Sequence, residues 1–410
     1  MAFDYAAARE KLLSMGACDR CLGRQFRGLF YGVDNGAVGS IVRKADSLAK
    51  AKKAKPGDVL LSKDCPLCAG HFMETRALAE KAAERLANLE FSSFLVGCKV
   101  EDALLNREEA LWNDIGGENC EPLKKDLVRQ IGLAVTELTG KDAEFAKPDV
   151  TVIADFTNSQ LSFDIHPVFI YGEYRKLVRG IPQTRWPCRD CRGRGCRKCN
   201  FTGKMYQESV EELVAAPFLA DTGAKGEKFH GSGREDIDAT MLGWRPFVLE
   251  LVSPVVRSLD WAAMAAKVNG TANGKVEVHA LRPSSKDELV LLKEAKHDKS
   301  YEAFIECAAE PSDEAIAQVI ALFTNKELEQ RTPDRVAHRR ADLVRKRMVY
   351  SVELARAGPL RLRAVIKAAS GTYIKELISG DDGRTKPSFA ELLGPCKCAE
   401  LNVLEVHAVA

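Results

Sequence analysis

Two long stretches of the chain repeat apolar residues at helical spacing. Residues 75–91 are rich in alanine, and their apolar side chains recur three or four positions apart, which places them on one face of a helix. Residues 123–138 show the same period and predict a second amphipathic helix. The apolar face of the first helix is formed by Leu78, Ala82, Leu86 and Leu89.

Near these helices the pattern changes to short apolar or alternating runs. Residues 91–100, FSSFLVGCKV, predict a strand. Residues 150–172 predict two strands joined at Asn158-Ser159, a dipeptide typical of hairpin turns. The segment from residue 76 to about residue 185 therefore combines helices with strands, and we expect an α+β module there.

From residue 205 onward, short strands and helices are mixed. Residues 360–368 alternate most cleanly, with apolar Leu362 and Ala364 set against Arg361 and Arg363. Further strands are predicted at 247–252, 275–281, 303–307 and 349–354, and helices at 210–219, 259–268, 313–324 and 389–393. We expect residues 205–410 to form a mixed-sheet α+β domain.

The composition agrees with a folded protein of more than one domain. A chain of 410 residues is too long for one ordinary domain, and 46% hydrophobic residues suffice for packed cores. No apolar run approaches the roughly 20 residues that cross a bilayer. The first residues, MAFDYAAAREKLLSMGACDRC, lack the apolar core of a signal peptide. We expect a soluble cytoplasmic protein that has no membrane partner.

Positive charge is concentrated in two runs, although the formal net charge is only +2. Residues 174–204 carry ten Lys or Arg and one acid, Asp190, and residues 331–347 carry seven basic residues against two acidic ones. A solvated face would explain one such run. Two runs, one of them wound around cysteines, indicate binding to the phosphate backbone of a nucleic acid.

Eight of the 13 cysteines form CxxC pairs. Two separated pairs can supply the four thiolates of one tetrahedral zinc site, and the other two pairs are as close together as in a zinc ribbon. Because the cytosol keeps thiols reduced, we expect structural zinc and not disulfides. Inert surface pairs are the alternative for the first group. The groups are Cys18, Cys21, Cys65 and Cys68, and Cys188, Cys191, Cys196 and Cys199.

A strongly charged loop leads directly into a predicted strand at residues 231–251, GSGREDIDATMLGWRPFVLEL. An aspartate such as Asp236 on a tight loop can be held rigidly over a cleft, although an ordinary acidic turn would explain this loop alone. Three other stretches add candidate chemistry: KSYEAFIEC (299–307), QRTPDRVAHRRADLVRKRMVYSVEL (330–354) and ASGTYIKELISGDDGRTKPSFAELLG (369–394).

Together these motifs resemble the pseudouridine synthases, which share GRxD, KxYxA and GTYI(R/K). The chain is most similar to the archaeal and eukaryotic Pus10 family of tRNA pseudouridine synthases, through GREDIDATMLGWRPFVLEL, TPDRVAHRRADLVR and GTYIKELISGDDGRTKPS. The resemblance implies an α+β protein with a pseudouridine synthase-type mixed-sheet catalytic domain and an N-terminal, zinc-bearing, THUMP-like accessory domain. The expected parts are a zinc-binding region (1–75), a THUMP-like RNA-binding domain (76–185), an inner four-cysteine ribbon (186–204) and the catalytic domain (205–410).

The resemblance also implies roles for individual residues. Asp236 would be the catalytic nucleophile, and Lys375 would pair with its carboxylate. Tyr301 would stack on the target uracil and take part in proton removal at C5. Asp238 is the second candidate for the nucleophile, because residues two apart on a strand share a face.

Two further residues are expected to bind the substrate: Arg234 at a phosphate and Tyr373 in the uridine pocket. The implied reaction isomerises the T-arm uridines at tRNA positions 54 and 55 to pseudouridine, in a monomer that needs no organic cofactor. The carboxylate can attack the ribose C1′ or the uracil C6, or assist departure of the base, and the residues leave these routes open.

Two other classes of protein share part of this pattern. A non-catalytic tRNA-binding or chaperone protein would show the same cysteines and basic runs, but binding alone does not require the set of Asp236, Tyr301, Tyr373 and Lys375. A THUMP-bearing methyltransferase or thiouridine synthetase should carry a glycine-rich nucleotide loop between a strand and a helix, and the sequence contains no such motif.

Overall fold

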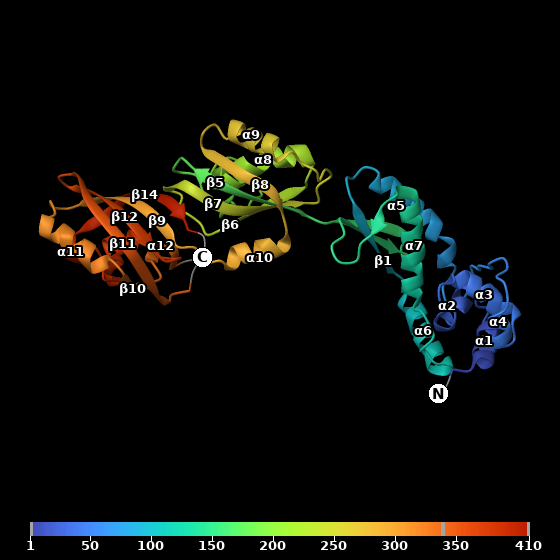
Figure 1. Ribbon diagram of the computed structural model, residues 1–410. Coiled ribbons are helices and arrows are strands. Elements are labelled where there is room, and N and C mark those ends of the chain that lie inside the picture. Colours follow the sequence, from blue (N-terminus) through green and yellow to red (C-terminus); the bar gives the residue numbers. More distant parts are fainter. Residues whose placement is uncertain (1–2, 338–340, 408–410) are drawn as a thin grey trace. The chain divides into compact units, whose positions relative to one another are not determined.

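The computed structural model describes residues 3–337 and 341–407, and it separates into two compact units. The first unit contains residues 1–167 together with Val255–Arg257, and the second contains Val168–Pro254 and residues 258–410. Both units mix helices with sheets (Figure 1), so the predicted α+β class is confirmed. Among the described residues, no helix is both long enough and apolar enough to cross a membrane.

The first unit contains a four-stranded sheet with the order β2-β1-β3-β4. Strand β1 is parallel to both of its neighbours, and β3 and β4 form the antiparallel hairpin that the sequence predicted around Asn158-Ser159. The strands are β1 (Ser93–Lys99), β2 (Asp142–Ala143), β3 (Val150–Asp155) and β4 (Gln160–Ile165).

Helices cover the buried face of this sheet and extend the same apolar core toward the N-terminus. The predicted helices at 75–91 and 123–138 correspond to α5 and α7, which pack on each other, and α7 lies on β1. The helices are α1 (Tyr5–Ser14), α2 (Asp19–Arg24), α3 (Asn35–Lys44), α4 (Leu48–Ala51), α5 (Thr75–Leu86), α6 (Asp102–Ile115) and α7 (Leu123–Thr139).

The second unit is built on one ten-stranded sheet with the order β13-β10-β11-β12-β9-β14-β7-β5-β8, and β6 also pairs with β7. All neighbouring strands are antiparallel except β14 and β7. The strands are β5 (Val168–Lys176), β6 (Gly226–Gly231), β7 (Ala239–Val252), β8 (Val276–Ser284), β9 (Lys299–Cys307), β10 (Lys326–Arg331), β11 (Val344–Gly358), β12 (Arg361–Ala368), β13 (Thr385–Lys386) and β14 (Cys396–Val406).

Two apolar cores lie along this sheet, one in each half. In Figure 1, α8 and α9 cover the half formed by β5, β7 and β8, while α11 lies against β11 in the other half. The helices are α8 (Val210–Thr222), α9 (Trp261–Thr271), α10 (Lys286–Glu294), α11 (Asp313–Phe323), α12 (Asp334–Ala337), α13 (Ile374–Ser379) and α14 (Ala390–Leu393).

Strand β5 belongs to the second unit, because it pairs with β7 and β8. The division between the units therefore falls between Pro167 and Val168, ahead of the domain limit expected at residue 185. The expected limits at residues 75, 185 and 204 stay predictions. Within the second basic run, His338, Arg339 and Arg340 lie outside the described residues.

Strand β7 changes partners along its length, and this change joins the two halves of the sheet. Residues 239–241 pair with β14, and residues 241–251 pair with β5. Gly243 lies directly after the change, where a Cβ atom would stand only 2.0 Å from the carbonyl oxygen of Leu404. Only glycine lets the two strand backbones approach this closely.

We predict that Gly243→Ala destabilises the second unit by about 1–3 kcal/mol, because the methyl group must push β14 away from β7. Gly270→Ala is the matched control. A Cβ atom at Gly270 meets nothing within 4 Å in α9, so this variant should be neutral or stabilised by up to about 1 kcal/mol. Denaturant unfolding of the full chain measures both values, and equal stabilities of the two variants would contradict the prediction.

Candidate active site

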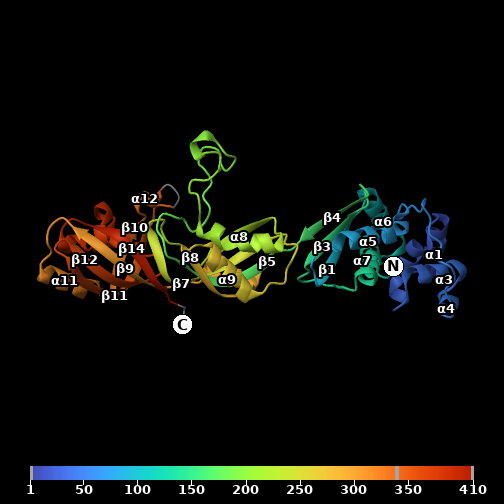
Figure 2. The ribbon, with the colours of Figure 1, turned by 90° about the horizontal axis from the view of Figure 1, so that it is seen from above.

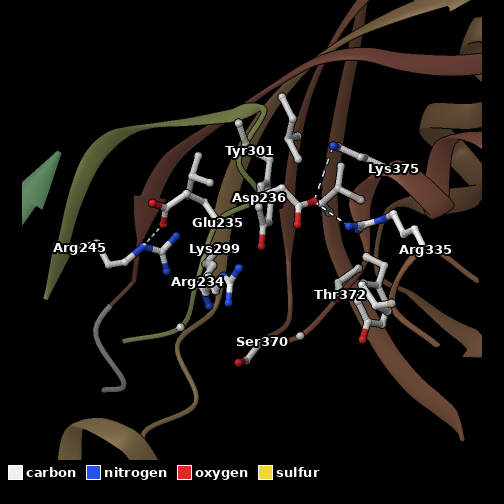
Figure 3. A pocket seen from close by; sticks show the side chains of 18 residues that line it. Arg234, Glu235, Asp236, Arg245, Lys299, Tyr301, Arg335, Ser370, Thr372 and Lys375 are labelled. Atoms are coloured by element: carbon white, nitrogen blue, oxygen red, sulfur yellow. Dashed lines mark ion pairs between the residues drawn. The ribbon is translucent and has the colours of Figure 1, made fainter. Parts of the chain in front are cut away.

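A cavity of about 530 Å³ lies in the second unit where the two halves of the sheet meet. Its walls come from the loop between β6 and β7, from β9 and β14, and from the segment that leads into α13 (Figure 3). Ala239, at the start of β7, and Leu401 and Val403 of β14 provide an apolar wall. Val336 and Ile374 add further apolar surface, and most of the remaining lining side chains are polar or charged.

The carboxylate of Asp236 lies between two cations, as Figure 3 shows. Its Oδ2 atom is 2.9 Å from Arg335 Nη1 and 3.6 Å from Lys375 Nζ. Arg335 also pairs with Glu376 through Nε, so the guanidinium is held from two sides. A carboxylate that is partly removed from water keeps its charge at lower cost when cations stand beside it.

Lys375 makes its shorter contacts with Asp238, at 2.7 Å to both carboxylate oxygens. The two candidate aspartates thus share one lysine. Asp238, however, is 69% exposed at its side chain and is not among the residues that line the cavity, whereas Asp236 is. The geometry therefore favours Asp236 over Asp238 as the carboxylate that meets a ligand in the cavity.

Buried polar side chains hold the Asp236 loop from beneath. Lys176 Nζ donates hydrogen bonds to the carbonyl oxygens of Asp236 (3.0 Å) and Ile237 (3.4 Å). On the other side of the loop, Glu235 is paired with Arg245 at 3.1 Å and accepts a hydrogen bond of 2.8 Å from Tyr174. These groups are buried, so the loop is fixed by hydrogen bonds and charge pairs that water does not screen.

Tyr301 reaches the cavity from β9 and is only 8% exposed. Burial raises the pKa of the Tyr301 phenol to about 12, with the charge of Arg245 acting against this and that of Asp236 acting with it. The phenol therefore keeps its proton at neutral pH. Tyr373 also lines the cavity, and its backbone is fixed because Gln330 bonds both its N–H and its C=O.

The cavity carries an excess of positive charge. Its lining includes five cationic side chains but only two carboxylates, those of Glu235 and Asp236. Such a balance suits a ligand that brings negative charge, for example a phosphate-bearing one. The cations are Arg234, Arg245, Lys299, Arg335 and Lys375.

The structure brings all five predicted catalytic and substrate-binding residues to this one cavity: Arg234, Asp236, Tyr301, Tyr373 and Lys375. Sequence reasoning did not single out Arg335, Arg245 or Lys299. Arg335 lies within the basic run 331–347, which was expected to bind phosphates and not to pair with Asp236, and Arg245 lies within GWRPF, to which no role was given. Lys299 opens the KxYxA motif.

Both predicted cysteine groups form compact clusters, and in each the four Sγ atoms lie within 4.8 Å of one another. The Sγ atoms of Cys18 and Cys68 are 3.8 Å apart, and those of Cys191 and Cys199 are also 3.8 Å apart. In a tetrahedral zinc site, neighbouring sulfurs lie about 3.8 Å apart, which matches these distances. The two sulfurs of a disulfide lie only about 2 Å apart. Either cluster can hold a metal ion.

Comparison with known families agrees with this arrangement. Residues 169–409 match the family model described as "Pus10, C-terminal", and residues 78–155 match the model described as "Pus10 THUMP domain, archaeal". The cavity thus lies in a unit of pseudouridine synthase class, and strands β1, β2 and β3 of the first unit lie in a THUMP domain. The chain belongs to the Pus10 family, which confirms the resemblance found in its motifs.

Curated relatives match over almost the whole chain. A protein from Methanothermobacter marburgensis named "tRNA pseudouridine synthase Pus10" is 43% identical over 396 residues, covering 95% of this chain and 94% of its own. One of the same name from Methanothrix thermoacetophila is 39% identical over 434 residues, covering 100% and 96%. A chain of a solved Cbf5-Nop10-Gar1 complex matches with a TM-score of 0.32 and 16% identity, covering 57% of this chain and 48% of its own.

The burial of Lys299 leads to a prediction about pH. Burial lowers the pKa of Lys299 to about 8, whereas an unfolded lysine titrates near 10.4. Between these values the unfolded chain binds more protons than the folded one, so stability rises with pH. From pH 8 to pH 10 the free energy of unfolding of the wild type should rise by about 2 kcal/mol more than that of Lys299→Met.

Chemical denaturation at several pH values provides the measurement. Lys293→Met serves as a control, since Lys293 is an exposed lysine of α10 in the same unit. This variant should follow the pH profile of the wild type. Parallel profiles for the wild type and Lys299→Met would show that Lys299 titrates normally.

Proposed function

We propose that the protein is a tRNA pseudouridine synthase that isomerises T-arm uridines, at tRNA positions 54 and 55. The observation that carries this proposal is the Asp236 carboxylate, held in a largely cationic cavity between Arg335 and Lys375 and opposite the KxYxA tyrosine, Tyr301. The names of the curated relatives support the same activity.

In this proposal Asp236 is the nucleophile. The reaction breaks the bond between uracil N1 and ribose C1′, rotates the base, and forms a bond between C5 and C1′. The C5 proton is lost and N1 gains a proton, so the reaction requires no oxidant or reductant. Attack by Asp236 at C1′ or at C6 needs an ionised carboxylate, and the adjacent cations favour that state.

Tyr301 has a matching role as a stacking platform for the uracil. The target base must leave its stack in the RNA to reach the cavity, and an aromatic ring compensates for part of the lost stacking. The raised pKa of Tyr301 keeps the phenol neutral, which favours stacking over direct proton removal by a phenolate. Arg234 and Tyr373 line the same cavity and are proposed to contact the phosphate and the uridine.

The arrangement supports an enzyme over a non-catalytic tRNA-binding protein. A protein that only binds RNA gains nothing from a carboxylate in its cationic cavity, because that carboxylate repels phosphate. The THUMP match over residues 78–155 supports an RNA-binding role for the expected THUMP-like domain at 76–185. A monomeric state and a cytoplasmic location stay predictions.

Asp236→Asn should lower pseudouridine formation by about 10³-fold or more, because the neutral amide is a poor nucleophile. The assay is tritium release from C5-labelled uridine in a tRNA transcript, run together with a tRNA-binding measurement that should be unchanged. Asp238→Asn is the matched control and should keep most of the activity. Equal release by the wild type and Asp236→Asn, with loss in Asp238→Asn, would transfer the nucleophile role to Asp238.

We further propose that zinc is the metal that both cysteine clusters hold, each as a closed structural site of four thiolates. Backbone N–H groups support this, since Gly195 donates to Cys191 Sγ at 3.2 Å and Gly203 to Cys199 Sγ at 3.3 Å. Such bonds favour the thiolate form that binds metal. The first cluster is buried in the core of the first unit, so its metal is proposed to stabilise that core.

Metal analysis of the purified protein should find two zinc ions per chain, one for each cluster. Cys21→Ser and Cys191→Ser should each lose one of them, and Cys21→Ser should also lower the melting temperature because Cys21 is fully buried. Cys398→Ser, outside both clusters, should retain both ions. Full zinc content in Cys21→Ser or Cys191→Ser would contradict the assignment.

A further inference from the structure

The two cations beside Asp236 are not equivalent. Arg335 Nη1 lies 2.9 Å from Asp236 Oδ2, whereas Lys375 Nζ lies 3.6 Å from that oxygen and makes its shorter contacts, at 2.7 Å, with Asp238. Both cations meet the same oxygen, and the other oxygen, Oδ1, accepts no hydrogen bond from the residues that the structure describes (Figure 3). The position of Arg335 therefore decides which oxygen of Asp236 is left for a ligand in the cavity.

The segment that carries Arg335 does little to hold its side chain. Arg335 belongs to α12, a helix of only four residues that follows β10 (Figure 2). The acid directly before it, Asp334, is engaged by Arg384 at 2.5 Å. The side chain of Arg335 is 37% exposed, and an arginine in such a position keeps many rotamers unless a partner fixes it.

Glu376 supplies that partner. Its carboxylate, only 6% exposed, contacts two nitrogens of the Arg335 guanidinium: Oε1 lies 2.5 Å from Nε, and Oε2 lies 3.3 Å from Nη2. A carboxylate that grips an arginine through two N–H groups fixes the plane of the guanidinium as well as its distance. This pairing uses one edge of the guanidinium and leaves Nη1 for Asp236.

The first turn of α13 thus organises both cations. Lys375 provides one of them directly, and Glu376, the next residue, holds the other. Glu376 is buried but does not line the cavity, so its charge is costly to keep and is not explained by contact with a ligand. The pair with Arg335 accounts for it.

We propose that Glu376 is a positioning residue for the reaction. It orients Arg335 so that the guanidinium clamps Oδ2 of Asp236 and leaves Oδ1 to attack the target nucleotide. Glu376 itself touches neither the substrate nor the reacting atoms. This inference rests on the proposed function, because it takes Asp236 as the nucleophile, and it extends that function to a buried residue outside the cavity.

The test measures single-turnover tritium release from a C5-labelled tRNA transcript, with full-length enzyme in excess, together with tRNA affinity. Glu376→Gln keeps the shape of the side chain but not its charge, and it should lower the rate about 10- to 100-fold through misplacement of the clamp, with tRNA affinity unchanged. Glu376→Asp keeps the charge at shorter reach, and its rate should fall between those of Glu376→Gln and the wild type.

Glu288→Gln is the matched control. Glu288 also grips an arginine, Arg282, through two N–H groups, and it lies outside the lining of the cavity. This variant should react at the rate of the wild type.

A double variant tests whether Glu376 acts through Arg335. Arg335→Gln removes the clamp itself, so adding Glu376→Gln should change the rate by no more than about 3-fold. An acid in the first turn of a helix also favours the helix. If that were the only role of Glu376, the losses from the two substitutions would multiply.

Arg335→Lys covers the case in which Glu376→Gln, a change at a buried position, fails to fold. Arg335 is partly exposed, and lysine keeps its charge but lacks the two edges that join Glu376 to Asp236. This variant should lose about 10-fold or more in rate with unchanged tRNA affinity. Denaturant unfolding of each variant shows whether it is folded.

The outcomes separate this inference from the proposed function. If the wild type releases tritium and folded Glu376→Gln or Arg335→Lys reacts at the same rate, the positioning role is overturned and the proposed function stands. Losses that multiply in the double variant overturn it as well. If the wild type releases no tritium, the proposed function fails and this inference fails with it. A slow Glu376→Gln whose effect disappears in the Arg335→Gln background establishes the positioning role.

Discussion

The parallel pairing of β14 with the first residues of β7 is the contact on which the second unit depends. It joins two halves that have separate apolar cores, and it places the Asp236 loop directly beside the strands that carry Tyr301 and the apolar wall of the cavity. The close approach of the β7 and β14 backbones at Gly243 lies in the same region of contact. The cavity therefore forms where the two halves of the sheet meet, and neither half alone would enclose it.

Electrostatics around Asp236 follow from this placement. The loop contributes the carboxylate, while Arg335 and Lys375 arrive from α12 and α13 in the other half of the sheet. Beneath the loop, Lys176 supports the backbone from β5. The carboxylate of Asp236, its counter-charges and its support therefore come from segments that are far apart in sequence and meet only in the folded unit.

Many of the helices and strands could be predicted from the sequence. The alternation at 360–368 and the helical period of 75–91 correspond to β12 and α5, because burial on one face determines both patterns. The motif GTYIK lies between the end of β12 and the first turn of α13. Strand β14 was missed, since its apolar residues are interrupted by Lys397, Glu400 and Glu405 and its partners lie far away in sequence. The pairing of Arg335 with Asp236 was missed for the same reason: the two residues are joined only by the tertiary fold.

The position of Lys176 determines where the protein can be truncated. An expression boundary at residue 205, the start of the expected catalytic domain, would leave out β5. The facing edges of β7 and β8 would lose their shared partner, and the carbonyl groups of Asp236 and Ile237 would lose their buried donor. A fragment that keeps the second unit whole therefore begins near Val168, because β5 of that unit supports the floor of the cavity.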